Sequence, residues 1–197
     1  MSETVGKAAI DAVFRSAIIH NYKKIKLKYA GGEPLLRFDL IRTLHRYALK
    51  QVEEKQIEIE GAILTNGTLL SKDKLELIQT LKLRVMVSMD GIDLAHDCQR
   101  RFEDGTDSFK QTKNGVELLL KEDMYPDVSI TVTNQNADKL TELTQWLLDH
   151  KLHFTFNLYR ENEFSKSRSA LKLEEKHIIK GLKRAYKIIE SNPPDRS

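Results

Sequence analysis

The sequence predicts an α/β protein built on parallel strands, and two observations carry that prediction. Helical and strand-like patterns alternate along the 197 residues, beginning with a helix and then repeating strand and helix. Such alternation implies right-handed crossovers between parallel strands. Several strands also alternate an apolar face with a small polar face, which indicates helices on one side only. We therefore expect a partial, TIM-like barrel with a polar interior rather than an open doubly wound sheet.

Each element is predicted from its own local pattern. Ile25, Leu27 and Tyr29 alternate with lysines, as in a strand, whereas Leu36, Leu40 and Leu44 recur at helical spacing. The predicted strands cover residues 25–29, 57–65, 83–89, 128–133 and 153–159. The predicted helices cover about residues 3–21, 36–48, 71–81, 108–120, 136–148 and 178–189, with Ser71, Ser108 and Asn136 as N-caps. We expect one domain over residues 1–192 and a mobile tail over residues 193–197.

Composition limits the classes of function. Lys and Arg number 32 against 29 Asp and Glu, so the net charge is +3, with no long basic run that would predict nucleic-acid binding. The sequence contains neither an apolar stretch long enough to span a membrane nor a signal-peptide pattern. The single cysteine, Cys98, excludes an internal disulfide and a cysteine-based zinc site. It also fits a reducing, cytoplasmic location.

The residues with distinctive chemistry fall at the carboxyl ends of the predicted strands, where parallel α/β folds place ligands. These stretches are Gly31-Gly32-Glu33-Pro34, Thr65-Asn66-Gly67-Thr68, Ser88-Met89-Asp90-Gly91, His96-Asp97-Cys98-Gln99-Arg100, Thr133-Asn134 and Asn157-Leu158-Tyr159. Taken singly, each has a plain structural interpretation, such as turn glycines at positive φ, a helix-opening proline or a half-buried Cys98. A glycosidase pair of Glu33 and Asp90 is a further interpretation, but no set of sugar-stacking aromatic residues accompanies them.

Five stretches in order, YAGGEPLL, LTNGTLL, VSMDG, HDxxR and DGTDSF, resemble the radical S-adenosylmethionine (SAM) superfamily. More narrowly, they resemble its peptide- and protein-modifying branch, which includes anaerobic sulfatase-maturating enzymes and their SPASM-type relatives. The resemblance extends from the first helix to about Asn162. It implies a six-stranded partial barrel, of which this chain holds strands two to six and lacks the first strand and the cluster loop.

The resemblance implies two cofactors, SAM and a [4Fe–4S] cluster. In the family, three cysteines of a CxxxCxxC pattern bind the cluster, and SAM is cleaved to a radical that takes hydrogen from the substrate. This chain has one cysteine and no such pattern. The resemblance therefore implies the core of a radical SAM enzyme that is inactive as given. The alternative is a non-catalytic, truncated paralogue that serves as a scaffold or as a nucleoside- or peptide-binding module.

The resemblance also implies which residues bind SAM. Gly31, Gly32 and Glu33 are expected at its amino group, Ser88 at its carboxylate or ribose, and Arg100 at its carboxylate. The pocket rim is expected at Asn66 and Asp90, and the adenine near Leu158. No catalytic residue or metal ligand is assigned. The expected partner is a peptide or protein, and the open edge of the 25–29 strand predicts self-association.

Overall fold

The computed structural model describes residues 1–160 and 174–192. Its strands are β1 (Lys24–Tyr29), β2 (Glu58–Thr65), β3 (Leu83–Ser88), β4 (Asp127–Val132) and β5 (Phe154–Leu158). Its α-helices are α1 (Glu3–Ile19), α2 (Phe38–Lys55), α3 (Lys72–Thr80), α4 (Leu94–Asp97), α5 (Phe109–Lys121), α6 (Leu140–Asp149) and α7 (Glu175–Ser191). Two short 3-10 helices, η1 (Pro34–Arg37) and η2 (Ala137–Lys139), precede α2 and α6.

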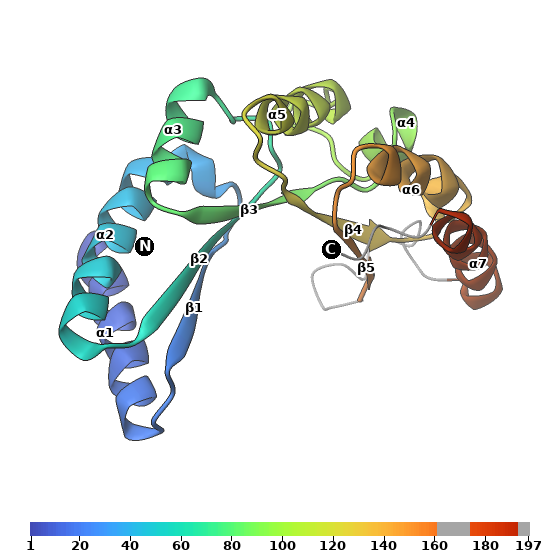
Figure 1. Ribbon diagram of the computed structural model, residues 1–197. Coiled ribbons are helices and arrows are strands. Elements are labelled where there is room, and N and C mark those ends of the chain that lie inside the picture. The colour runs from blue at the N-terminus through green and yellow to red at the C-terminus, as the bar shows by residue number, and fades with distance from the viewer. Residues whose placement is uncertain (161–173, 193–197) are drawn as a thin grey trace. The chain divides into compact units, whose positions relative to one another are not determined.

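The strands form one sheet in the order β1-β2-β3-β4-β5. β1 pairs with β2 in parallel, with Lys24 opposite Glu58, and β4 pairs with β5 in parallel, with Val128 opposite Phe154. A helix lies between each pair of consecutive strands (Figure 1). This arrangement confirms the predicted α/β class, a partial barrel of parallel strands.

The chain divides into two compact units. The first, here called the N-terminal unit, comprises residues 1–65 and 69–86, and the second, the C-terminal unit, comprises residues 66–68 and those from 87 onward. Figure 1 shows the first mainly in blue to green and the second in green to red. Each unit carries part of the strand-end chemistry and is described separately below.

The core of the N-terminal unit lies between its first two helices and its first two strands. Figure 1 shows α1 and α2 on the same side of β1 and β2. Ile10 and Phe14 of α1 pack with Ile25 of β1 and with Leu44 and Ala48 of α2. On the exposed positions of β1, Lys24 Nζ lies 2.6 Å from Glu60 of β2. The two faces of β1 therefore differ as the alternating sequence predicts.

In the C-terminal unit, β4 shows the same alternation. Val128, Ile130 and Val132 are fully buried, whereas Ser129 and Thr131 between them are half-buried. The last helix packs against η2 so closely that a Cβ on Gly181 would collide with the Ala137 carbonyl oxygen. Glycine is required there by close approach, not by its backbone angles.

Helix N-termini differ from the predicted caps. Ser71 and Ser108 occupy N-cap positions, but neither side chain makes a capping hydrogen bond. At α5 the role is taken by Asp97, whose Oδ1 accepts hydrogen bonds of 2.8 Å from the backbone N–H groups of Ser108 and Phe109. Asn136 likewise does not cap η2, because its side chain is used elsewhere.

Three further expectations concern the exposure of Cys98, membrane-spanning helices and the C-terminal tail. Cys98, expected to be at least half-buried, is exposed, although its Sγ lies within hydrogen-bonding distance of the Ala95 carbonyl. Within residues 1–160 and 174–192, none of the helices is both long and apolar enough to cross a membrane. The predicted tail, residues 193–197, lies outside the described residues.

Candidate functional site

The loop after β1, Gly31-Gly32-Glu33-Pro34, borders an open cavity in the N-terminal unit. The cavity has a volume of about 330 Å³. It is lined by residues 28–34, together with Met1, Arg37, Leu40, Ile41 and Leu44. Gly31 and Gly32 are exposed, and Glu33 is half-buried. This loop, here called the GGEP loop, is the first candidate site.

Nothing in the described part of the chain explains why two glycines occupy this loop. A Cβ built on Gly31 or Gly32 has no described atom within 4 Å, and neither residue has a φ in the left-handed region. Gly67, by contrast, has φ of 79° and is a true turn glycine. The missing side chains at Gly31 and Gly32 leave their backbone amide and carbonyl groups open to close approach by a ligand.

Glu33 is held in place from two sides. Its Oε1 accepts hydrogen bonds from the Leu35 backbone N–H (3.0 Å) and from the Thr65 hydroxyl at the end of β2 (2.7 Å). The first bond caps the following 3-10 helix, which Pro34 opens. The second joins the loop to the neighbouring strand. The loop is therefore fixed by its own carboxylate, while its glycine backbone stays exposed.

A buried pair lies beneath the end of β1. The Tyr29 hydroxyl donates to His45 Nδ1 over 3.0 Å, and His45 Nε2–H donates to the Leu81 carbonyl over 3.1 Å. These bonds fit the neutral imidazole with its proton on Nε2. Burial lowers the pKa of His45, although the bond to Leu81 opposes that shift. A Cβ on Gly61 would come within 2.5 Å of His45 Cε1, so this glycine makes room for the ring.

In the C-terminal unit, Asp90 organises the second candidate site. Its side chain is 3% exposed, and one carboxylate oxygen binds Arg100 Nε at 2.5 Å while the other accepts from the Thr131 backbone N–H at 2.6 Å. Its carbonyl accepts from Asn136 Nδ2 at 2.6 Å. Burial raises the pKa of Asp90, and the Arg100 guanidinium opposes that rise. Asp90 thus links the end of β3 to β4 and to Arg100.

Arg100 is anchored through one edge of its guanidinium. Asp90 binds Nε, and Nη2 lies 3.5 Å from the Thr131 hydroxyl. The side chain is 32% exposed, and Nη1 makes no hydrogen bond with a described residue. A guanidinium fixed in this way presents its remaining N–H groups in a fork that suits a carboxylate.

His96 and Ser108 support the segment that carries Arg100. His96 is buried, and its Nδ1 accepts from the Asp90 backbone N–H at 3.3 Å. Its Nε2–H reaches the Ser108 hydroxyl at 3.2 Å, and that hydroxyl donates to the Arg100 carbonyl. Desolvation by burial, with help from Arg100, lowers the pKa of His96 to about 4. Together with the bonds by which Asp97 caps α5, these contacts give both His96 and Asp97 a structural role.

The remaining predicted site residues have separate surroundings. Asn66 Oδ1 accepts from both the backbone N–H and the hydroxyl of Thr68, and the Asn66 carbonyl accepts from the Thr112 hydroxyl. Ser88 is half-buried, and Leu158 at the end of β5 is 52% exposed. The structure therefore brings Asp90 and Arg100 into direct contact, and it keeps Gly31, Gly32 and Glu33 together in one loop.

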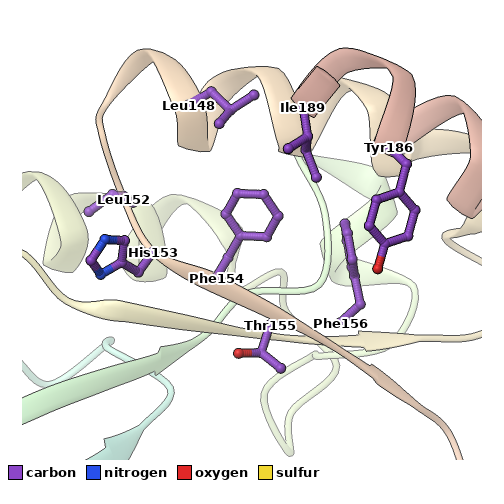
Figure 2. Close-up of a pocket in the computed structure, with 8 residues that line it drawn as sticks. All are labelled: Leu148, Leu152, His153, Phe154, Thr155, Phe156, Tyr186 and Ile189. Atoms are coloured by element: carbon purple, nitrogen blue, oxygen red, sulfur yellow. The ribbon is translucent and has the colours of Figure 1, made fainter. Parts of the chain in front are cut away.

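A larger apolar pocket lies in the C-terminal unit between β5 and the last two helices. It has a volume of about 520 Å³. Figure 2 shows Phe154 and Phe156 of β5 pointing toward α6 and α7, and Tyr186 and Ile189 of α7 pointing back toward them. The Phe156 and Tyr186 rings are 6.1 Å apart in an edge contact. Apolar side chains make up most of the described lining, which also includes His153 and Thr155.

The residues of this chain do not fit an iron–sulfur cluster. Such clusters are held by several cysteine thiolates, and the sequence contains only Cys98. Although Cys98 is exposed, partial desolvation of its thiol raises its pKa, which disfavours the thiolate. Among the described residues, no group of three His, Cys, Asp or Glu side chains could hold a metal ion. The GGEP loop, in contrast, offers the open backbone that close approach by a small ligand requires.

Several partners in these sites were not identifiable from the sequence. In the sequence, Thr65 is marked only as part of a strand-end turn, although its hydroxyl anchors Glu33. His45 and Asn136 lie far along the chain from the atoms they bind. No local pattern marks such contacts, because they depend on which elements pack together. Only the position of Thr65 at a predicted strand end gave a usable signal.

The fold and these sites define an α/β protein of parallel strands whose polar groups gather at the strand ends. The family model of the Radical SAM superfamily matches residues 4–147. The chain belongs to this superfamily.

Relatives with different activities match parts of the chain. An uncharacterized protein of Methanocaldococcus jannaschii is 32% identical over 125 residues, 64% of this chain and 43% of that protein. A cysteine-type anaerobic sulfatase-maturating enzyme of Clostridium perfringens is 25% identical over 130 residues, 64% of this chain and 34% of the enzyme. A GTP 3′,8-cyclase of Campylobacter jejuni is 28% identical over 165 residues, 83% of this chain and 48% of the enzyme.

Solved structures share the fold. The structure of native anSMEcpe with bound AdoMet matches with a TM-score of 0.83 and 22% identity, covering 97% of this chain and 52% of that one. The same protein with bound AdoMet and the Kp18Cys peptide also matches with a TM-score of 0.83. The chain thus spans about half the length, or less, of these proteins.

Proposed function

We propose that this chain is the SAM-binding core of a radical SAM enzyme that acts on a peptide or protein. One observation carries the proposal: Gly31 and Gly32 expose their backbone beside a cavity, although no described contact and no backbone angle requires glycine there. A ligand that approaches the backbone closely would explain why both positions are glycine. Membership of the superfamily makes SAM the expected ligand.

In this proposal the GGEP loop receives the SAM amino group. An ammonium group offers only donors, so it requires carbonyl or carboxylate oxygens. The loop provides the carbonyls of Gly31 and Gly32, and Glu33 adds a negative charge whose Oε1 is fixed by Thr65 and Leu35. When bound in this superfamily, SAM supplies the group that removes hydrogen from the substrate. The loop residues bind and orient it.

The contacts that residues of the C-terminal unit are expected to make with SAM are predicted separately from those of the GGEP loop. Arg100 offers the free N–H groups that a carboxylate requires, and Asp90 holds its guanidinium in orientation. The half-buried Ser88 is predicted to bind the SAM carboxylate or ribose. Asn66 is predicted at the pocket rim, and Leu158 near the adenine.

A peptide or protein substrate is supported by the sulfatase-maturating relative and by the peptide-bound structural neighbour. The GTP 3′,8-cyclase relatives support a nucleotide as the second candidate substrate.

We also propose that this chain alone lacks radical activity, since one thiol cannot replace the several that hold a cluster. The single cysteine favours a second candidate function, that of a non-catalytic scaffold or a nucleoside- or peptide-binding module. In either case we propose a location in the cytoplasm.

Calorimetric titration of SAM into this chain tests the proposal. We expect measurable binding that falls by about tenfold or more in Gly31→Val and Gly32→Val, because side chains there would obstruct close approach by the ligand. Folding stability should change little in either variant, since a Cβ at each position has open space. Equal binding by both variants and the unmodified chain would contradict the assignment of the loop.

Anaerobic reconstitution with iron and sulfide tests the proposed inactivity. We expect no stoichiometric [4Fe–4S] absorbance from this chain, whether or not SAM binds. A chain that binds SAM without the cluster supports a SAM-binding core, whereas a chain that binds neither contradicts that core and supports a scaffold without a nucleoside pocket. A stoichiometric cluster signal would contradict the proposed inactivity.

A further inference from the structure

The last helix, α7, carries basic side chains on the face opposite its packing face. Its buried residues are Ile178, Gly181 and Ala185, which lie on one side of the helix. Because successive residues turn by about 100°, the opposite side carries a different set. We call this set the basic row: Lys176, Lys180, Lys183, Arg184 and Lys187, all exposed.

The basic row is not arranged to stabilise its own helix. Like charges three and four positions apart on a helix repel, and Lys176 lies in the first turn, where the helix dipole disfavours a cation. Arg184 Nη1 lies 3.4 Å from Asp138 Oδ1. The four lysines form no ion pair with any residue of the described part of the chain. Among the described residues, the four lysine charges are therefore not neutralised by an ion pair.

The row also borders a shallow, open hollow whose described lining belongs to α7 alone, here called the groove. Its volume is about 370 Å³, and Ile179, which is 43% exposed, lies among the basic side chains that line it. Lysines three or four residues apart are separated by roughly 4.5–6 Å along a helix. An extended peptide presents side chains on one face every ~6.6 Å. Carboxylates on alternate residues of such a peptide are spaced slightly farther apart, within the reach of the flexible four-carbon lysine side chains.

We propose that the basic row of α7 binds an acidic, extended segment of the polypeptide on which this chain acts. The proposal rests on the proposed function, because it assigns a charge to the substrate of that same protein. Opposite charge is the main support, and the groove with Ile179 supplies a place for an apolar side chain beside the carboxylates.

The composition of the row favours a peptide over a nucleic acid. Single-stranded nucleic acids are bound by basic grooves that also hold aromatic rings for base stacking. Among the described lining residues of this groove, Ile179 alone is uncharged, and the nearby Tyr186 ring contacts Phe156 instead. Four of the five basic residues are lysines, and the arginine is already bonded to Asp138. Lysines act as point charges that suit separate carboxylates.

Fluorescence anisotropy with the full chain tests the proposal. The probe is a labelled peptide of about 12 residues that alternates glutamate with alanine, long enough to cover the row when extended. The test variant is Lys176→Gln/Lys180→Gln/Lys183→Gln/Lys187→Gln. The matched control removes four exposed lysines of other helices for which no ion pair with a described residue is found: Lys50→Gln/Lys72→Gln/Lys110→Gln/Lys121→Gln.

We expect saturable binding at low salt, weakened about tenfold in the test variant and less than about twofold in the control, because each exposed ion pair contributes modestly. Added salt should weaken binding, and a peptide alternating glutamine with alanine should not bind. Equal losses in the two variants, or no binding of the acidic peptide, would overturn the proposal. Tighter binding of a single-stranded oligonucleotide through the same row would also overturn it.

SAM titration of the test variant keeps this inference distinct from the proposed function. Unchanged SAM binding with lost peptide binding supports both. SAM binding without any binding of the acidic peptide refutes the inference alone. Peptide binding through the row without SAM binding would refute the proposed function and leave a peptide-binding surface.

Discussion

At the scale of single residues, His96 shows how neighbours fix a protonation state. In the neutral ring, Nδ1 accepts from the Asp90 amide and Nε2–H is donated to the Ser108 hydroxyl. A proton added at Nδ1 would face the Asp90 N–H and break the first bond. It would also add a positive charge near Arg100. These costs and the burial of the ring lower the pKa of His96 to about 4.

This low pKa makes folding stability depend on pH. Below pH 6.5 the histidine of the unfolded chain takes up a proton, whereas His96 in the folded chain does so only near pH 4. The unfolded state therefore binds more protons between these values, so stability is lost as the pH falls through this window. The full loss from His96 is about 3 kcal/mol.

Urea denaturation at several pH values between 6.5 and 4 checks this prediction. We expect the unfolding free energy of His96→Gln to fall less with decreasing pH than that of the unmodified chain. The control is His153→Gln, since His153 is exposed. His45, whose pKa is also lowered, is present in both variants and cancels in the comparison. Identical pH slopes for the His96 variant and the unmodified chain would refute the assignment.

At the scale of elements, the start of α5 depends on a residue outside the helix. Asp97 lies 11 and 12 positions before the two amides that it binds. It satisfies two N–H groups that have no partner within the helix, and its negative charge faces the positive end of the helix dipole. Ser108, adjacent to the helix, supports Arg100 and His96 instead.

We expect Asp97→Ala to lower the unfolding free energy by about 1–2 kcal/mol, the usual cost of losing a helix cap. Asp97→Asn should lower it less, because its side-chain oxygen can still accept both bonds. Ser71→Ala is a suitable control, since Ser71 occupies the N-cap of α3 in an extended backbone conformation without a capping side-chain bond. Urea midpoints measure all three variants. An Asp97→Ala midpoint equal to that of the control would mean that the cap contributes little.

The same helix shows what sequence could and could not predict. The positions of α5 and of β4 followed from periodicity, since Val116 and Leu119 repeat at helical spacing and Ile130 and Val132 at strand spacing. The resemblance implied Arg100 at the SAM carboxylate and Asp90 at the pocket rim, but not the direct bond between them. The Asp97 cap and the two bonds of Asn136 to strand-end carbonyls were not predictable. They join residues whose proximity is decided only by packing.

At the scale of the whole molecule, β1 ends the strand order on one side. The Lys23 carbonyl accepts from the Glu58 N–H. In a parallel ladder alternate residues bond to one neighbour, so Ile25, Leu27 and Tyr29 face β2. The amides of Lys24, Lys26 and Lys28 then face away from β2. Lysines on an edge strand discourage pairing with another chain, but Lys24 and Lys26 both lie within 4 Å of Glu60, which reduces that protection.

We therefore expect the chain to self-associate through β1 at high protein concentration. Lys26→Pro should abolish this association, because proline removes an outward amide without removing a bond to β2. Lys26→Thr should retain it, since threonine removes only the charge and keeps the amide. Light scattering over a concentration series measures the mass of each variant, and circular dichroism confirms that the proline variant remains folded. The edge does not mediate association if the unmodified chain stays monomeric throughout, or if the proline and threonine variants associate equally.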